Sequence, residues 1–306
     1  MIEVQNLSRL YGDFAAVDDV TFGIESGEVV GLLGHNGAGK TTIMKMITAF
    51  IEPSAGQVRV DGVDVQEQPL AVQAEMGYLP ENLPLYPELT VADYLTHAAE
   101  LRGFNPADCL GEAIDATQLN DKAFDRIDTL SRGYKQRLGV AQAILHRPKF
   151  LILDEPSNGL DPNQIREMRS LIKRLAEHAT VILSTHIMQE VNAVCDRVLI
   201  LRGGKLVVDE KLEDLQRARA VSLRTAPEVD VAALTSSLSG LGQVIQSGVG
   251  EWTLGVEGNA DETIDAVAQA LASQGAPIYH LAQAARDLEA VFAEVNEAGG
   301  EGKDAA

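Results

Sequence analysis

The stretch Gly34-His35-Asn36-Gly37-Ala38-Gly39-Lys40-Thr41-Thr42 decides the fold. It follows an apolar run, Glu28–Leu33, that predicts a buried strand, and it precedes apolar residues at helical spacing: Ile43, Met46, Ile47 and Phe50. A glycine-rich loop between a strand and a helix lets main-chain N–H groups converge on phosphate oxygens at the positive end of the helix. In such a loop Lys40 would reach the β- and γ-phosphates, and the Thr41 hydroxyl would bind Mg²⁺. The pattern predicts a nucleotide-binding site.

Length and charge bound the class of protein. The chain has 306 residues, which suits one large domain and one small one. Its net charge of −20 disfavours direct binding to nucleic acid or anionic lipid, which proteins approach through basic surfaces. No apolar run approaches the roughly 20 residues that cross a bilayer, and Glu3 interrupts a signal-peptide interpretation. Cys109 and Cys195 lack metal-ligand spacing and are expected to be reduced. We expect a cytoplasmic protein that reaches a membrane only through a protein partner.

Two further apolar strands end in residues that suit nucleotide chemistry. Phe150–Leu153 runs into Asp154 and Glu155, and 180–183 runs into Ser184-Thr185-His186. Ligands of nucleotide-binding parallel sheets lie at the carboxyl ends of the strands, so these side chains should meet the phosphate loop. Asp154 would hold Mg²⁺ through a water molecule, Glu155 would polarise an attacking water, and His186 would contact the γ-phosphate. A purely structural role is the commoner alternative for a single histidine.

The segments between these strands carry weaker signals. Tyr11 lies at a turn, where its ring could stack on a purine base or simply pack on the surface. Three prolines in Pro80–Pro87 predict an irregular connector, and helical periodicity dominates from about 91 to 128. Leu130-Ser131-Arg132-Gly133-Tyr134 precedes a further helix, at whose start serine and glycine form either an anion-binding terminus or an ordinary cap.

Together these residues resemble the ATP-binding subunits of ABC transporters over about residues 1–215. The resemblance implies an α/β P-loop ATPase core with antiparallel β and helical subdomains, the helical one at about 82–148. It implies that ATP and Mg²⁺ are the cofactors, and that two subunits, identical or related, close head to tail around two ATP molecules. It also implies a separately encoded membrane permease as partner, with the chain peripheral on the cytoplasmic face of the membrane.

The same resemblance assigns roles to individual residues. It places Tyr11 at the adenine, Glu155 and His186 in catalysis, and Asp161 in the D-loop. The loop called Walker A would bind ATP through Gly34, His35, Asn36, Gly37, Ala38, Gly39, Lys40, Thr41 and Thr42. The signature that contacts the partner's ATP would be Ser131, Arg132, Gly133 and Tyr134, and the Mg²⁺ residues would be Thr41, Glu81 and Asp154.

Two departures from the family pattern narrow the prediction. Glu81 stands where glutamine is usual, and Arg132 and Tyr134 replace glycine and glutamine of the signature. With the Tyr-Leu-Pro-Glu-Asn run, these features resemble single-cassette exporter ATPases of drug efflux, gliding motility or copper-site maturation. A soluble mechanochemical ATPase of the same fold is the alternative, and a nucleotide-sensing scaffold with a degraded site is a third.

The pattern changes near residue 220. Over 220–296 the apolar spacing predicts strand, helix, strand, strand, helix, strand and a last helix, an order typical of a small ferredoxin-like α+β domain. His280 is expected to be a packed residue rather than a ligand. The domain shows no recognisable chemistry, and regulation or dimer support is the role we expect for it. The tail, 297–306, is expected to be disordered.

Overall fold

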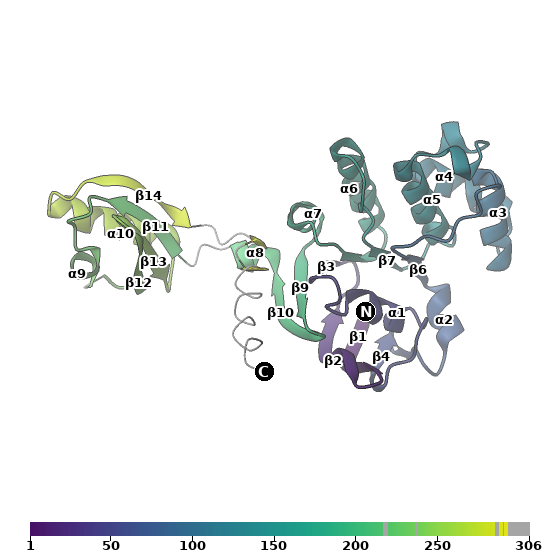
Figure 1. Cartoon of the computed structure of the whole chain (residues 1–306), viewed down its shortest axis with the longest axis horizontal. Coiled ribbons are helices and arrows are strands. Elements are labelled where there is room, and N and C mark those ends of the chain that lie inside the picture. Colours follow the sequence, from purple (N-terminus) through teal and green to yellow (C-terminus); the bar gives the residue numbers. More distant parts are fainter. Residues whose placement is uncertain (217–219, 237, 285–287, 290, 293–306) are drawn as a thin grey trace. The chain divides into compact units, whose positions relative to one another are not determined.

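The computed structural model describes residues 1–216, 220–236, 238–284, 288–289 and 291–292. The chain divides into two compact units, Met1–Lys211 and Leu212–Ala306 (Figure 1). The tail predicted for 297–306 lies outside the described residues, as does much of the last predicted helix.

A six-stranded, mainly parallel sheet forms the centre of the first unit. Its order is β10-β9-β3-β8-β7-β6, and only β10 runs antiparallel to its neighbour. Strand β3 lies between β8 and β9, which are far from it in the sequence. The carboxyl ends of these three parallel strands therefore lie side by side. The bounds are β3 Val29–Leu33, β6 Met76–Leu79, β7 Phe150–Asp154, β8 Thr180–Ser184, β9 Arg197–Arg202 and β10 Lys205–Lys211.

Helices and a second sheet cover the two faces of this sheet. On one side α6 (Pro162–Ala176) and α7 (Met188–Val194) pack on it; on the other lie α1 (Lys40–Ile47) and an antiparallel sheet (Figure 1). Side chains alternate between the two cores, since Ile152 joins the α1 side while Leu151 and Leu153 join the α6 side. The antiparallel sheet has the order β2-β1-β4-β5, from Ile2–Tyr11 (β1), Phe14–Ile24 (β2), Ala55–Val60 (β4) and Val63–Asp64 (β5).

One apolar position was assigned wrongly from helical spacing. Phe50 continues the 43-46-47 pattern, but α1 ends at Ile47 and Ala49 follows with φ +57°. The left-handed residue turns the chain out of the helix, so the Phe50 ring is 69% exposed instead of joining the core.

A helical subdomain is inserted between β6 and β7, as predicted. It contains α3 (Val91–Leu101), α4 (Leu110–Ala116) and α5 (Arg132–Ile144), which bury a core of their own; α2 (Pro69–Ala74) precedes β6. Gly77 of β6 brings α5 against the sheet, because a Cβ there would overlap the carbonyl oxygen of Ala143. Residues 80–87 have no helix or strand, as the prolines require.

In the second unit, the described residues form an antiparallel sheet with two helices between its strands, and a further helix precedes the sheet. After α8 (Leu212–Gln216) the order is β11 (Ala220–Thr225), α9 (Val231–Thr235), β12 (Leu241–Gly248), β13 (Glu251–Val256), α10 (Ala260–Ser273) and β14 (Ile278–Ala284). The strands pair in the order β12-β13-β11-β14 around a core that includes Val221, Leu254, Val267 and Leu271. The strand and helix order matches the sequence-based expectation, while the ferredoxin-like assignment stays a prediction.

Candidate functional site

The glycine-rich loop joins β3 to α1 at the carboxyl edge of the parallel sheet. Gly39 stands at the N-cap of α1 with φ +105°, and a Cβ there would lie 2.5 Å from the carbonyl oxygen of Ala16. No side chain caps this helix, so its first N–H groups remain available as donors to a ligand. The Lys40 side chain is buried and extends across the loop. Its amine donates to the Gly34 carbonyl at 2.6 Å.

Asp154 ends β7 and connects the loop with the neighbouring strand β8. Its Oδ2 accepts a hydrogen bond from the Thr41 hydroxyl at 2.8 Å, and its Oδ1 accepts one from the Ser184 hydroxyl at 2.9 Å. The side chain is 1% exposed. Burial raises the pKa of the Asp154 carboxyl; the two hydroxyls oppose this shift, and the nearby Glu81 carboxylate adds to it.

Glu155 follows in a backbone conformation that is unusual for its residue type. Its φ is +51°, and its N–H donates to the Ser184 carbonyl at 3.0 Å. One carboxylate oxygen, Oε2, lies 2.8 Å from Nδ1 of His186. Left-handed backbone costs about 1–3 kcal/mol and concentrates at functional sites, so the strain points to a role for this side chain.

The environment of Glu155 favours its protonated form. The residue is 7% exposed, and burial raises the pKa of its carboxyl, while the hydrogen bond and charge of His186 pull the pKa back towards its ordinary value. A carboxylate whose pKa moves towards neutrality is better suited to accept a proton from water at pH 7.

These groups open onto one cavity of about 680 Å³. It is lined by Tyr11, Phe14, Ala16, His35, Asn36, Gly37, Ala38, Gly39, Lys40, Thr41, Thr42, Glu81, Asp154, Glu155, Asn158 and His186. The volume falls in the range of small-molecule sites, about 300–1,000 Å³. Thus the structure brings together Tyr11, most of the loop, Glu81, Asp154, Glu155 and His186, as the sequence predicted.

Neither Phe14 in the lining of the cavity nor the contact between Ser184 and Asp154 was predicted from the sequence. Phe14 pairs with Tyr11 across the β1–β2 turn, and both rings are exposed at the cavity. Ser184, the second support of Asp154, immediately precedes the Thr185-His186 pair. An aromatic residue three positions after Tyr11, across a Gly-Asp turn, was the available signal for Phe14. This wall of the cavity therefore offers two aromatic faces rather than one.

The signature segment lies at the start of α5, outside the lining of this cavity. Ser131 is the N-cap of α5, and its hydroxyl accepts from the Tyr134 N–H at 3.4 Å. Ser131 and Arg132 are exposed, whereas Tyr134 packs partly against the helical-subdomain core. A Cβ on Gly133 would meet the Gln164 side chain at 2.8 Å. The lack of a side chain at Gly133 therefore lets α5 approach the start of α6.

Asp161 has a local structural task in this chain. It is the N-cap of α6, where its Oδ1 accepts from the N–H groups of Asn163 and Gln164 at 2.9 and 3.0 Å. Gln164 returns the contact to the Asp161 N–H and completes a capping box. The carboxylate thus fixes the end of the loop that begins at Glu155.

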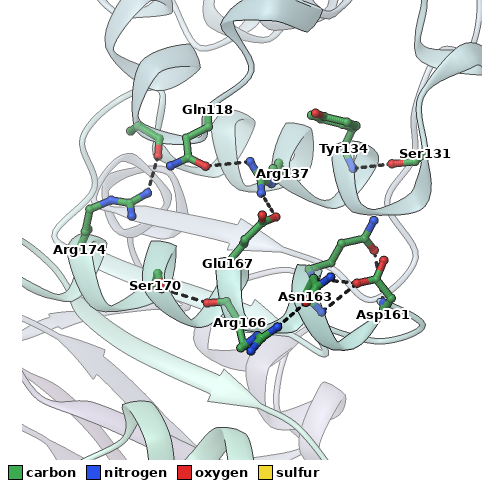
Figure 2. Close-up of polar contacts among 12 residues, drawn as sticks. Gln118, Ser131, Tyr134, Arg137, Asp161, Asn163, Arg166, Glu167, Ser170 and Arg174 are labelled. Atoms are coloured by element: carbon green, nitrogen blue, oxygen red, sulfur yellow. Dashed lines mark hydrogen bonds and ion pairs between the residues drawn. The ribbon is translucent and has the colours of Figure 1, made fainter.

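Polar side chains join α6 to the helical subdomain (Figure 2). Arg137 of α5 lies between Gln118 and Glu167, donating to both carbonyl and carboxylate oxygens, and its guanidinium also lies 5.7 Å from the Tyr134 ring centre. Arg174 of α6 donates to the Ala116 carbonyl at 3.1 Å. The helix that starts at Ser131 is therefore tied to the helix that starts after Asp161.

Comparison with known proteins identifies the family. A family model described as ABC transporter matches residues 17–158. An ABC transporter ATP-binding protein of Bacillus subtilis, YdbJ, is 31% identical over 301 residues, which is 97% of this chain and 96% of that protein. The chain is an ABC transporter ATP-binding protein. It therefore carries an ABC ATPase domain that binds ATP.

Other relatives of this ABC protein agree. The bacitracin transport ATP-binding protein BcrA of Bacillus licheniformis is 35% identical over 219 residues, covering 71% of this chain and 72% of that protein. A solved ATP-binding subunit of an ABC transporter is 32% identical, with a TM-score of 0.64 over 71% of this chain and 92% of that one. Among the helices that the structure describes, none is long and apolar enough to cross a membrane.

The residues present fit a magnesium ion held jointly with a nucleotide. Within the described residues there is no group of three or more His, Cys, Asp and Glu side chains that could hold a metal unaided. The Thr41 hydroxyl and the Asp154 carboxylate instead converge at 2.8 Å beside the phosphate loop. Mg²⁺ is commonly bound by one or two carboxylates together with substrate phosphates, and this pair matches that donor set.

Proposed function

We propose that this chain is the ATP-hydrolysing motor subunit of a membrane exporter whose permease is a separate protein. The observation that carries the proposal is the meeting of Lys40, the Thr41–Asp154 pair and the Glu155–His186 pair in one cavity. This is a set for hydrolysis as well as binding, because it includes a buried carboxylate held by a partner at the phosphate edge.

Each residue has a task that follows from its position. The loop N–H groups and Lys40 bind the phosphates, and Tyr11 and Phe14 hold the base. Glu155 accepts a proton from the attacking water. His186 orients the Glu155 carboxylate through Nδ1, and its exposed remainder is free to reach the γ-phosphate.

Magnesium would be bound by Thr41 and Asp154, with Glu81 nearby in the same cavity. When bound, Mg²⁺ neutralises charge on the β- and γ-phosphates. The Ser184 hydroxyl keeps Asp154 in position for this task by holding its second oxygen.

Two such subunits would close head to tail, each placing Ser131 and Gly133 on the ATP of the other. The exposure of Ser131 and its position outside its own cavity support this arrangement. The exporter assignment is supported by BcrA, which is named for bacitracin transport, and by the Glu81 and Arg132 departures. A cytoplasmic position on the membrane surface, reached through the permease, completes the proposal.

The test is an affinity purification from detergent-solubilised membranes of the host. The Glu155→Gln variant with ATP is used to hold the closed state, and Lys40→Ala is the control that should bind ATP weakly. Recovery of a multi-span protein with Glu155→Gln, reduced with Lys40→Ala, is the expected result. Recovery of soluble partners alone, with the ATPase absent from the membrane fraction, would contradict the exporter role and favour a soluble mechanochemical ATPase.

A further inference from the structure

The nucleotide cavity of this chain carries an excess of negative charge. Three carboxylates line it, from Glu81, Asp154 and Glu155, while Lys40 is the one lysine or arginine among the lining residues. Glu81 lines the same cavity as the Thr41–Asp154 pair, so its charge acts on the site. Bound ATP would add further negative charge. Magnesium held at Thr41 and Asp154 would offset part of this charge, and a further cation would stabilise the loaded site more.

Arg132 is a positively charged residue that could supply this charge. Its side chain is exposed, and among the residues that the structure describes none forms a hydrogen bond or ion pair with it. Arg137, five positions later on the same helix, is instead 14% exposed and is satisfied by Gln118 and Glu167. Arginine left unpaired beside paired arginine on one helix points to a partner outside this chain.

The guanidinium of Arg132 lies beside the loop that follows Glu155 of its own chain. It lies over Gly159, whose φ is +72° and where a Cβ would overlap it. Gly159 follows Asn158, a lining residue of the cavity, but Arg132 itself does not line that cavity. The absence of a side chain at Gly159 thus leaves room for the guanidinium beside the loop that follows Glu155. Its charge is positioned at this edge without serving the site of its own chain.

We propose that Arg132 of one subunit reaches the ATP site of a second copy and offsets the charge of Glu81 there. The inference rests on the head-to-tail pair proposed above, in which Ser131, the neighbour of Arg132, faces the partner's phosphates. The two departures from the family pattern, Glu81 and Arg132, are then one compensating pair. Arginine suits the task because its charge is permanent and its donors form a planar fork that fits carboxylate and phosphate oxygens.

The experiment is a double-mutant cycle on dimer formation. In the Glu155→Gln background with ATP and Mg²⁺, sedimentation velocity measures the dimer dissociation constant of four forms. They are the form that keeps both Arg132 and Glu81, the two single variants Arg132→Gln and Glu81→Gln, and the double variant. Both side chains are exposed, so neither change should disturb folding. Dimer formation is read directly, so the result does not depend on turnover.

The expected result is non-additive. Arg132→Gln should weaken the dimer by about tenfold when Glu81 is present and by no more than about threefold with Glu81→Gln, as coupled charges do. Arg132→Lys should recover most of the loss, because it retains the charge. Lys149→Gln, which removes a positive charge that pairs with Glu75 away from the site, is the matched control and should change the constant less than about twofold.

Two outcomes would overturn the inference, and they differ. Equal losses from Arg132→Gln with and without Glu81→Gln would show that the two residues are not coupled, while the dimer and the proposed function stand. Failure of every form, the one that keeps both residues included, to dimerise with ATP would refute the head-to-tail assembly itself, and the inference with it. Higher salt should shrink the Arg132 effect, as expected for a charge contact.

Discussion

Replacing Glu155 by glutamine should separate binding of ATP from its hydrolysis. Glutamine has nearly the same shape, and its amide oxygen can still accept a hydrogen bond from Nδ1 of His186, now 2.8 Å from the carboxylate. The change therefore removes the proton acceptor but leaves the histidine in place. ATP affinity should remain within a few fold of the unchanged protein, since the phosphate loop is untouched.

The size of the effect follows from burial. A general base contributes about 10²–10⁴-fold to rate, which is about 2.7–5.4 kcal/mol of barrier at 1.36 kcal/mol per tenfold. Glu155 is 7% exposed, so bulk water has little access to replace it. We therefore expect a loss in the upper half of this range, about 10³-fold or more in kcat.

The assay is phosphate release at saturating ATP, with nucleotide affinity measured separately. Glu177→Gln is the matched control: this exposed glutamate lies at the end of α6, away from the cavity, and its replacement should leave turnover unchanged. A Glu155→Gln protein that retains turnover within tenfold of the unchanged chain would refute the assignment of the base.

The direction of the pKa shift adds two readouts for the same variant. Because burial raises the pKa of Glu155, turnover should fall as pH drops through that raised value, and Glu155→Gln should lose this acid limb. The folded state binds the proton more tightly than the unfolded chain, so stability falls as pH rises from the unfolded to the folded pKa. Above both pKa values the buried, ionised carboxylate lowers the free energy of unfolding. The Tm of Glu155→Gln at pH 7 should therefore match or exceed that of the unchanged protein.

Three other substitutions test the remaining parts of the site and fold. Lys40→Ala removes the amine that spans the phosphate loop and should weaken ATP binding by at least tenfold in a titration calorimeter, an effect of at least about 1.4 kcal/mol; unchanged affinity would count against the loop assignment. Tyr11→Ala should raise the KM for ATP severalfold with kcat nearly unchanged, because base stacking is worth roughly 1–3 kcal/mol and Phe14 remains; an unaltered KM would leave Tyr11 a surface residue. Gly77→Ala should lower the unfolding free energy by about 1–3 kcal/mol or more in urea, since the new methyl overlaps a backbone carbonyl, whereas Gly111→Ala, with open space around it, should be neutral or stabilising by up to about 1 kcal/mol; similar effects of both would contradict the packing argument.

Local sequence spacing was sufficient to predict most of the residues that line the cavity at the carboxyl edge of the parallel sheet. A glycine-rich loop between an apolar strand and a helix, and an apolar strand that ends in Asp154-Glu155, depend on residues within about ten positions of one another. The same holds for the inserted helical layer, whose periodicity is visible before any packing is known. Helical spacing failed at Phe50, because a single left-handed residue, Ala49, ended the pattern.

By itself, then, the sequence determined the family resemblance and the phosphate loop, and it predicted Glu155 as the base and His186 as a contact of the γ-phosphate. Only the tertiary structure decided how they meet: Thr41 touches Asp154 across 113 positions, and Ser184 supports the same carboxylate, because β3, β8 and β7 are neighbours in an order that differs from their order in the chain. It also decided that Arg132 stays unpaired over Gly159, as far as the described residues extend. Periodicity records which face of an element is apolar, but strand order and the partners of exposed charges are set by how the elements pack.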